Sequence, residues 1–141
     1  MNKDIAIIGV PMDLGQTRRG VDMGPSAIRY AGVIEFLEKL GYKVRDLGDL
    51  HINRNSNNTV DHSGINNLAE VVQVNTVLAG KVQNILEDGA FPLIFGGDHS
   101  IAIGSLAGIS PFFDNLGVLW FDAHGDLNTP ETTPSGNIHG M

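Results

Sequence analysis

The stretch "IAIIGV", residues 5–10, is a short run of apolar, mostly β-branched residues, and a polar, glycine-rich loop follows it directly at 11–24. A run that is apolar at every position is typical of a strand covered on both faces, as in a parallel sheet. Three later segments also predict strands: "YKVRDL" (42–47), "FPLIFG" (91–96) and "LGVLWFD" (116–122).

Segments whose apolar residues recur at helical spacing lie between these strands. We expect one helix from Pro25, a favoured first residue, to Leu40, with Gly41 as its stop. A second should run from Asn67 to Asp88 and a third over 101–109. Strands that alternate with helices predict an α/β fold with a mainly parallel sheet. The polar, Asn-rich residues 51–64 predict a mobile loop.

Composition narrows the possible functions. The 141 residues suit one domain, and no apolar run approaches the length of a membrane span. The net charge is −7, and the only adjacent basic pair is Arg18–Arg19, so neither nucleic acid nor a membrane is expected as a partner. There are no cysteines, which excludes disulfides and thiolate metal sites. A cytoplasmic location is the default expectation.

Acidic and imidazole side chains gather where two predicted strands end. Asp122, His124 and Asp126 alternate after the strand at 116–122, and His99 follows the strand at 91–96. Alternate residues of an extended segment point the same way, and the carboxyl ends of parallel strands form the usual ligand edge. Oxygen and imidazole ligands without sulfur suit Mn²⁺, Fe²⁺, Co²⁺ or Zn²⁺. The alternative is that none of them binds a metal: Asp122 caps a neighbouring element, His124 is an ordinary hydrogen-bonded side chain, and Asp126 is an acid of the loop.

Three separated motifs resemble the ureohydrolase family, and specifically its arginase type. They are "GVPMDLGQTRRGVDMGPSAIR" (9–29), "FGGDHS" (95–100) and "DAHGDLNTPETTPSGNIHGM" (122–141), and they occur in the family's order. The resemblance implies a three-layer α/β/α fold. It also implies hydrolysis of L-arginine to L-ornithine and urea by two Mn²⁺ ions with a bridging hydroxide, in an enzyme that forms a homo-oligomer.

By the same resemblance, His99 and Asp126 would bind one manganese, His124 would bind the other, and Asp122 would bridge them. His139 would carry protons, a role suited to a side chain that titrates near neutral pH. Asp98 is expected to orient His99 or to serve the fold.

The residues expected to face the substrate's α-carboxylate are Asn128, Ser135 and Asn137, and Thr133 is expected to shape their loop. Amide and hydroxyl groups can donate hydrogen bonds to an anion. The alternative for this segment is simple turn chemistry. The resemblance also implies that the first loop lies near the active-site rim, but Asp13, Arg18 and Asp22 in this loop are predicted to be solvated.

The pattern departs from the family in one respect. Chains of the family are longer, and their later part carries an Asp-x-Asp pair that completes both metal shells; no such pair occurs here. We therefore expect residues 1–141 to be the N-terminal part of a single arginase-like catalytic domain, with its second metal site incomplete. Such a truncated sheet would leave a free strand edge, so we expect the fragment to be inactive and poorly stable.

Other functions stay open. An agmatinase or another guanidino-compound hydrolase is the nearest alternative, and urea release from agmatine would reveal it. A two-metal phosphoesterase also uses Asp-x-His, but its Gly-Asn-His-Asp motif is absent. A catalytically dead, truncated metal-binding protein would bind fewer than two ions per chain.

Overall fold

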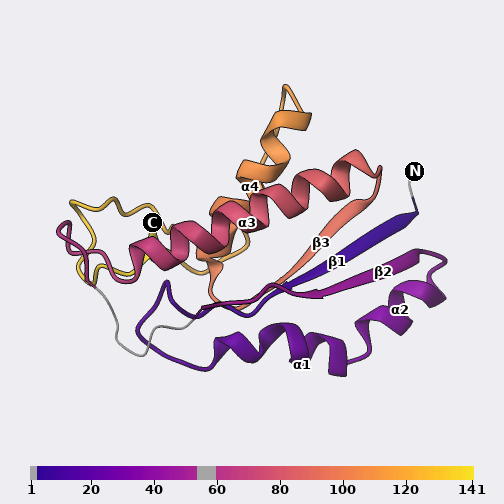
Figure 1. The fold of residues 1–141 in the computed structure, drawn as a ribbon, viewed down its shortest axis with the longest axis horizontal. Helices are drawn as coiled ribbons and strands as arrows, with labels where there is room; N and C mark the ends of the chain where they lie inside the picture. The colour runs from indigo at the N-terminus through magenta and orange to yellow at the C-terminus, as the bar shows by residue number, and fades with distance from the viewer. Residues whose placement is uncertain (1–2, 54–59) are drawn as a thin grey trace.

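The computed structural model describes residues 3–53 and 60–141 (Figure 1). Its three strands are β1 (Asp4–Val10), β2 (Lys43–Asp49) and β3 (Phe91–Gly96). They form a parallel sheet in the order β2-β1-β3, with Ile7 of β1 opposite Asp46 on one side and Leu93 on the other. The predicted strands 5–10, 42–47 and 91–96 are confirmed. Residues 54–59 of the predicted loop lie outside the described residues.

Helices cover both faces of this sheet. The described helices are α1 (Gly24–Tyr30), α2 (Val33–Lys39), α3 (Leu68–Glu87) and α4 (Ala102–Ile109), with 3₁₀ turns at Val21–Met23, His99–Ile101, Ser110–Phe112 and Ile138–Gly140. Figure 1 shows α1 and α2 on one side and α3 and α4 on the other. The expected three-layer α/β/α architecture is therefore confirmed. Among the described residues, no helix combines the length and apolarity that crossing a membrane requires.

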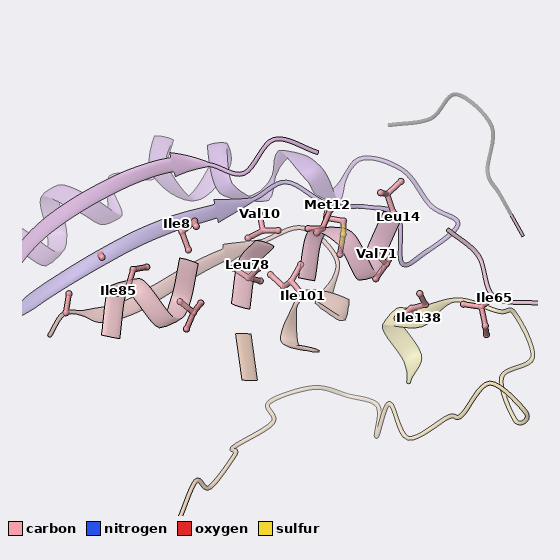
Figure 2. Close-up of a cluster of buried hydrophobic side chains, with 14 residues drawn as sticks. Ile8, Val10, Met12, Leu14, Ile65, Val71, Leu78, Ile85, Ile101 and Ile138 are labelled. Atoms are coloured by element: carbon pink, nitrogen blue, oxygen red, sulfur yellow. The ribbon is translucent and has the colours of Figure 1, made fainter. Parts of the chain in front are cut away.

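Alternate residues of β1 face different helices. Ile5 and Ile7 belong to a small core with Phe95 and side chains of α2. Ala6, Ile8 and Val10 pack instead into the larger core under α3, which Figure 2 shows. Leu78 of α3 is fully buried there. Burying such a side chain contributes about 1.5–3 kcal/mol, so the side under α3 supplies most of the hydrophobic stabilisation.

The expectation of one helix over 25–40 is wrong. The chain forms α1 and α2 instead, separated at Ala31 and Gly32. Gly32 has φ 79°, in the left-handed region that a continuous right-handed helix cannot contain. The break redirects α2, whose Val33, Ile34 and Leu37 then reach the small core.

The predicted strand at 116–122 is also not observed. These residues have no strand pairing, and Leu119 and Phe121 are 84% and 92% exposed. Val118, Leu119 and Trp120 line a cavity that Ile94 of β3 also lines, so the segment lies near the sheet without joining it. A strand apolar on both faces needs a cover on each, and no described helix supplies the outer one.

Candidate active site

The site lies at the carboxyl edge of the sheet, where the chain leaves β1 and β3. The two exits are bound to each other: Gly97 N–H donates to Val10 O at 3.1 Å, and Asp98 N–H donates to Met12 O at 2.7 Å. A Cβ atom at Gly97 would collide with the Met12 carbonyl, so only glycine permits this approach. The edge predicted from topology is therefore the place where the two loops meet.

Asp98 holds this junction together. It is buried, its Oδ2 accepts from Gly15 N–H at 2.9 Å, and its Oδ1 accepts from Ser100 N–H at 3.0 Å. The second bond caps the 3₁₀ turn that begins with His99. Of the two expected roles, the contacts support the structural one: Asp98 fixes the first loop and the start of the turn that presents His99.

Three of the four predicted metal ligands come together. One ligand atom each of His99, Asp122 and Asp126 lies within 4.8 Å of the others. His99 Nε2 is 3.2 Å from Asp126 Oδ2, but it is buried and makes no hydrogen bond. Trp120 Nε1–H donates to the same carboxylate oxygen at 3.3 Å. A buried nitrogen that makes no hydrogen bond and lies beside two carboxylates fits a divalent cation with oxygen and imidazole ligands.

Asp126 adopts a backbone conformation that is uncommon outside glycine, with φ 48°. Aspartate tolerates this left-handed region better than most residues. Residues held in such regions concentrate at functional sites.

The fourth predicted ligand, His124, lies at the exposed edge of this group. Its side chain is 81% exposed, and its Nδ1 lies 3.2 Å from Asp122 Oδ1. The backbone N–H of His124 donates to the same oxygen at 2.9 Å, which lowers the pKa of the Asp122 carboxyl. His124 is therefore linked to the three-residue group through its hydrogen bonds to Asp122.

A cavity of about 540 Å³ opens beside this group. It is lined by Gln16, His99, His124, Gly125, Asp126, Asn128, Thr133, Pro134, Ser135, Asn137, His139 and Gly140. Every predicted site residue except Asp122 is among these. The structure thus gathers in one hollow the side chains that sequence reasoning selected from separate segments.

The rings of His139 and His99 pack edge to face at the wall of this cavity, with centroids 5.1 Å apart. Its Nδ1 is 2.8 Å from the carbonyl oxygen of Gly15. Because a carbonyl only accepts, Nδ1 carries the hydrogen, and Nε2 is left without one in the neutral ring.

Thr133 and Ser135 shape the loop that carries Asn137. Thr133 Oγ1 accepts from Gly136 N–H at 3.2 Å, and Ser135 Oγ accepts from Asn137 N–H at 3.3 Å. Asn128 N–H, at the loop's other end, donates to Gly140 O at 3.1 Å. These bonds hold the loop closed against the cavity, and the role of Thr133 in shaping it stays a prediction.

Comparison with known protein families shows which family this chain belongs to. The model of the Arginase family matches residues 3–141. This chain belongs to the arginase family. The arginase of Bacillus subtilis (strain 168) is 61% identical over 141 residues, which cover 100% of this chain and 47% of that protein. The arginase of Bacillus caldovelox is 60% identical over 140 residues. The chain spans about half the length of these curated relatives.

Solved arginase structures have the same fold. The native structure of Bacillus caldovelox arginase at pH 5.6 superposes with a TM-score of 0.93 at 60% identity, covering 99% of this chain and 47% of that one. The Entamoeba histolytica arginase in complex with L-ornithine gives a TM-score of 0.81 at 35% identity, covering 99% and 48%. The agmatine ureohydrolase of Thermoplasma volcanium, at 24% identity and a TM-score of 0.69, shares the fold.

Two residues of this arginase-family chain were missed or misjudged from sequence. Gln16 lines the cavity, and its Nε2 is buried without a hydrogen-bond partner. Its position in the loop after a parallel strand was the available signal. Asp13, predicted to be solvated, is 1% exposed and pairs with Arg19 Nε at 3.1 Å. The prediction failed because the loop folds back onto Asp13, whose Oδ2 also accepts from Gly20 N–H at 3.2 Å.

Proposed function

We propose that the whole protein hydrolyses L-arginine to L-ornithine and urea and that it uses Mn²⁺. The observation that carries this proposal is the shared cavity of His99, Asp126 and His139 with the amides of Asn128 and Asn137. The cavity combines a cation-binding end with neutral donors suited to a carboxylate. Membership of the arginase family supports the same reaction.

The acidic and imidazole residues at one end of the site would bind the metal. His99, Asp122 and Asp126 would hold a cation, and His124 would extend the site through Asp122. Divalent ions at such a site lower the pKa of a water molecule and so supply a nucleophile near neutral pH.

The cavity walls would serve the substrate. The unprotonated Nε2 of His139 can accept a proton and deliver it to the leaving amine. Asn128, Ser135 and Asn137 would receive the α-carboxylate and set the distance between that end of the substrate and the cations.

Urea release from the full-length protein with Mn²⁺ tests the proposal, with L-arginine and agmatine as parallel substrates. Turnover of L-arginine in clear preference to agmatine is the expected result. Preference for agmatine would move the protein to the alternative guanidino hydrolase, and no urea from either would reject guanidine chemistry.

For residues 1–141 by themselves we propose weak metal binding and no efficient turnover. Within the described residues, a single group of three acidic or imidazole side chains offers close ligand atoms. Counting Mn²⁺ per chain by metal analysis checks this: about one ion or fewer is expected, and two tightly held ions with full turnover would contradict it. The cytoplasmic location and the homo-oligomer stay predictions, for cell fractionation and light scattering to test.

A further inference from the structure

Asn66 is bound to the loop that carries Ser135 and Asn137, although it lies far from that loop in sequence. Its backbone N–H donates to Gly136 O at 2.9 Å. Its side-chain Nδ2 donates to Ser135 O at 3.0 Å and to Asn137 Oδ1 at 2.9 Å. A Cβ atom at Gly136 would collide with the Gly64 carbonyl, so the two loops touch as closely as backbones allow. Asn66 therefore fixes the orientation of the Asn137 side chain.

The chemistry of the three groups permits a single arrangement of the two amides. The Ser135 carbonyl can only accept a hydrogen bond, so the NH₂ group of Asn66 must face it. That same NH₂ group lies against Asn137, so Asn137 must present its oxygen to Asn66. The NH₂ group of Asn137 is then turned away from Asn66, and nothing in the described part of the chain accepts a hydrogen bond from it.

Asn137 is 7% exposed and lines the cavity. An NH₂ group at the wall of a cavity, with no acceptor in the described protein, can donate to an acceptor on a ligand. An anionic oxygen is the strongest such acceptor. An amide turned the other way would instead present its oxygen to the cavity and repel a carboxylate.

We infer that Asn66 is a positioning residue that makes the cavity selective for a carboxylate, because it holds the donor end of Asn137 toward the ligand. The inference rests on the proposed function, in which the amino-acid end of the substrate lies against Asn137. It adds a residue that does not itself line the cavity and that acts through Asn137.

The variant Asn66→Asp tests this in the full-length protein. A carboxylate at this position faces two acceptors, Ser135 O and Asn137 Oδ1, and the repulsion is relieved when the Asn137 amide turns over. The cavity then presents an oxygen to the ligand. L-ornithine, with its carboxylate, should bind more weakly, whereas L-ornithinamide, whose carboxamide can donate, should be spared. We expect the ratio of their Kd values to change by about 10- to 100-fold, the size of one charge-assisted hydrogen bond.

Calorimetric titration of both ligands gives this ratio without any turnover. In urea assays, the same variant should raise KM for L-arginine much more than it lowers kcat. Asn115→Asp, the same change at an exposed turn, should leave the ratio unaltered. Asn66→Ala, which removes the donor without adding repulsion, should shift the ratio in the same direction by less, and it carries the test if the aspartate variant does not fold.

Equal weakening of both ligands by Asn66→Asp and Asn66→Ala would show that Asn66 merely supports the loop, and it would overturn the inference. A wild-type protein that binds L-ornithine but releases no urea would reject the proposed function and leave the ratio as a valid test. A wild-type protein that binds neither ligand would contradict both the proposed function and the inference about Asn66.

Discussion

His139 Nδ1 lies 2.8 Å from the carbonyl oxygen of Gly15, a residue 124 positions earlier in the chain. The backbone N–H of His139 donates to the same oxygen at 3.1 Å. Gly15 N–H, in turn, donates to Asp98 Oδ2. The backbone of Gly15 therefore joins Asp98, which caps the turn that begins with His99, to the ring of His139, and this link fixes the spacing of the two imidazoles.

This contact separates the two roles of His139 experimentally. The asparagine of a His139→Asn variant can still donate to Gly15 O, because an asparagine Nδ2 occupies much the same place as a histidine Nδ1. It cannot carry a proton at the Nε2 position. We expect kcat for L-arginine to fall by about 10²–10⁴-fold while the melting temperature is retained. His62→Asn, at an exposed histidine, is the matched control, and an unchanged kcat for His139→Asn would remove His139 from proton transfer.

Asp126→Asn should weaken Mn²⁺ binding. The change removes the negative charge 3.2 Å from His99 Nε2, and the remaining amide oxygen can still accept from Trp120. Altering even an outer partner of a metal site costs about 10- to 100-fold in affinity, so replacing a ligand should cost at least as much. Titration followed by the Mn²⁺ electron paramagnetic resonance signal measures it, with Asp114→Asn at an exposed acid as control. Equal affinity in the two variants would place the cation elsewhere.

Much of this site could be predicted because its residues carry their own signals. His99 follows β3, whose carboxyl end parallel topology sends to the ligand edge. Asp122, His124 and Asp126 follow an apolar segment that lies near the sheet without joining it. Gln16 offers only its position in the loop after β1, and Asn66 carries no signal of its own, because an isolated Asn in a loop is ordinary turn composition. Their importance depends on loop-to-loop contacts that sequence spacing does not reveal.

The errors in the fold have a similar origin. The helical spacing of apolar residues continues from α1 into α2, but Gly32, in the left-handed conformation, divides the two helices. The φ angle of a glycine inside a helical pattern cannot be predicted from the pattern. The segment 116–122 has the composition of a buried strand, yet pairing and cover decide whether a strand forms. Phe121 and Leu119 are exposed because the described elements provide neither.

The protein should lose stability in acid partly through Asp46. Arg29 Nε and Nη2 donate to the two oxygens of Asp46 at 2.7 and 2.9 Å, and these bonds hold the pKa of that carboxyl below its ordinary value. A depressed pKa gives stabilisation that is present above the unfolded value, near pH 4, and is lost as the pH falls through the folded value. Asp46→Asn should therefore cost about 1 kcal/mol at pH 7, since the pair is partly exposed, and the difference from wild type should shrink below about pH 4.

Urea unfolding of wild type and Asp46→Asn across this pH range gives the comparison. Asp114→Asn controls for the general loss of negative charge. A difference that stays constant, or that grows in acid, would contradict the sign of the linkage.

Two glycines on neighbouring helices should respond to alanine in opposite directions. Gly104 of α4 lies against α3: its N–H donates to Asn75 Oδ1 at 2.7 Å, and an added Cβ would stand 2.6 Å from Asn75 O. Gly104→Ala should destabilise the protein by about 1–3 kcal/mol, because the helices must separate. Gly80 of α3 has open space around its Cβ position, so Gly80→Ala should stabilise by about 0.5–1 kcal/mol through helix propensity. Urea midpoints at matched slopes decide between these signs. Equal effects of the two substitutions would mean that α3 and α4 do not pack this closely. The structural support for the turn that presents His99, which leads into α4, would then be in doubt too.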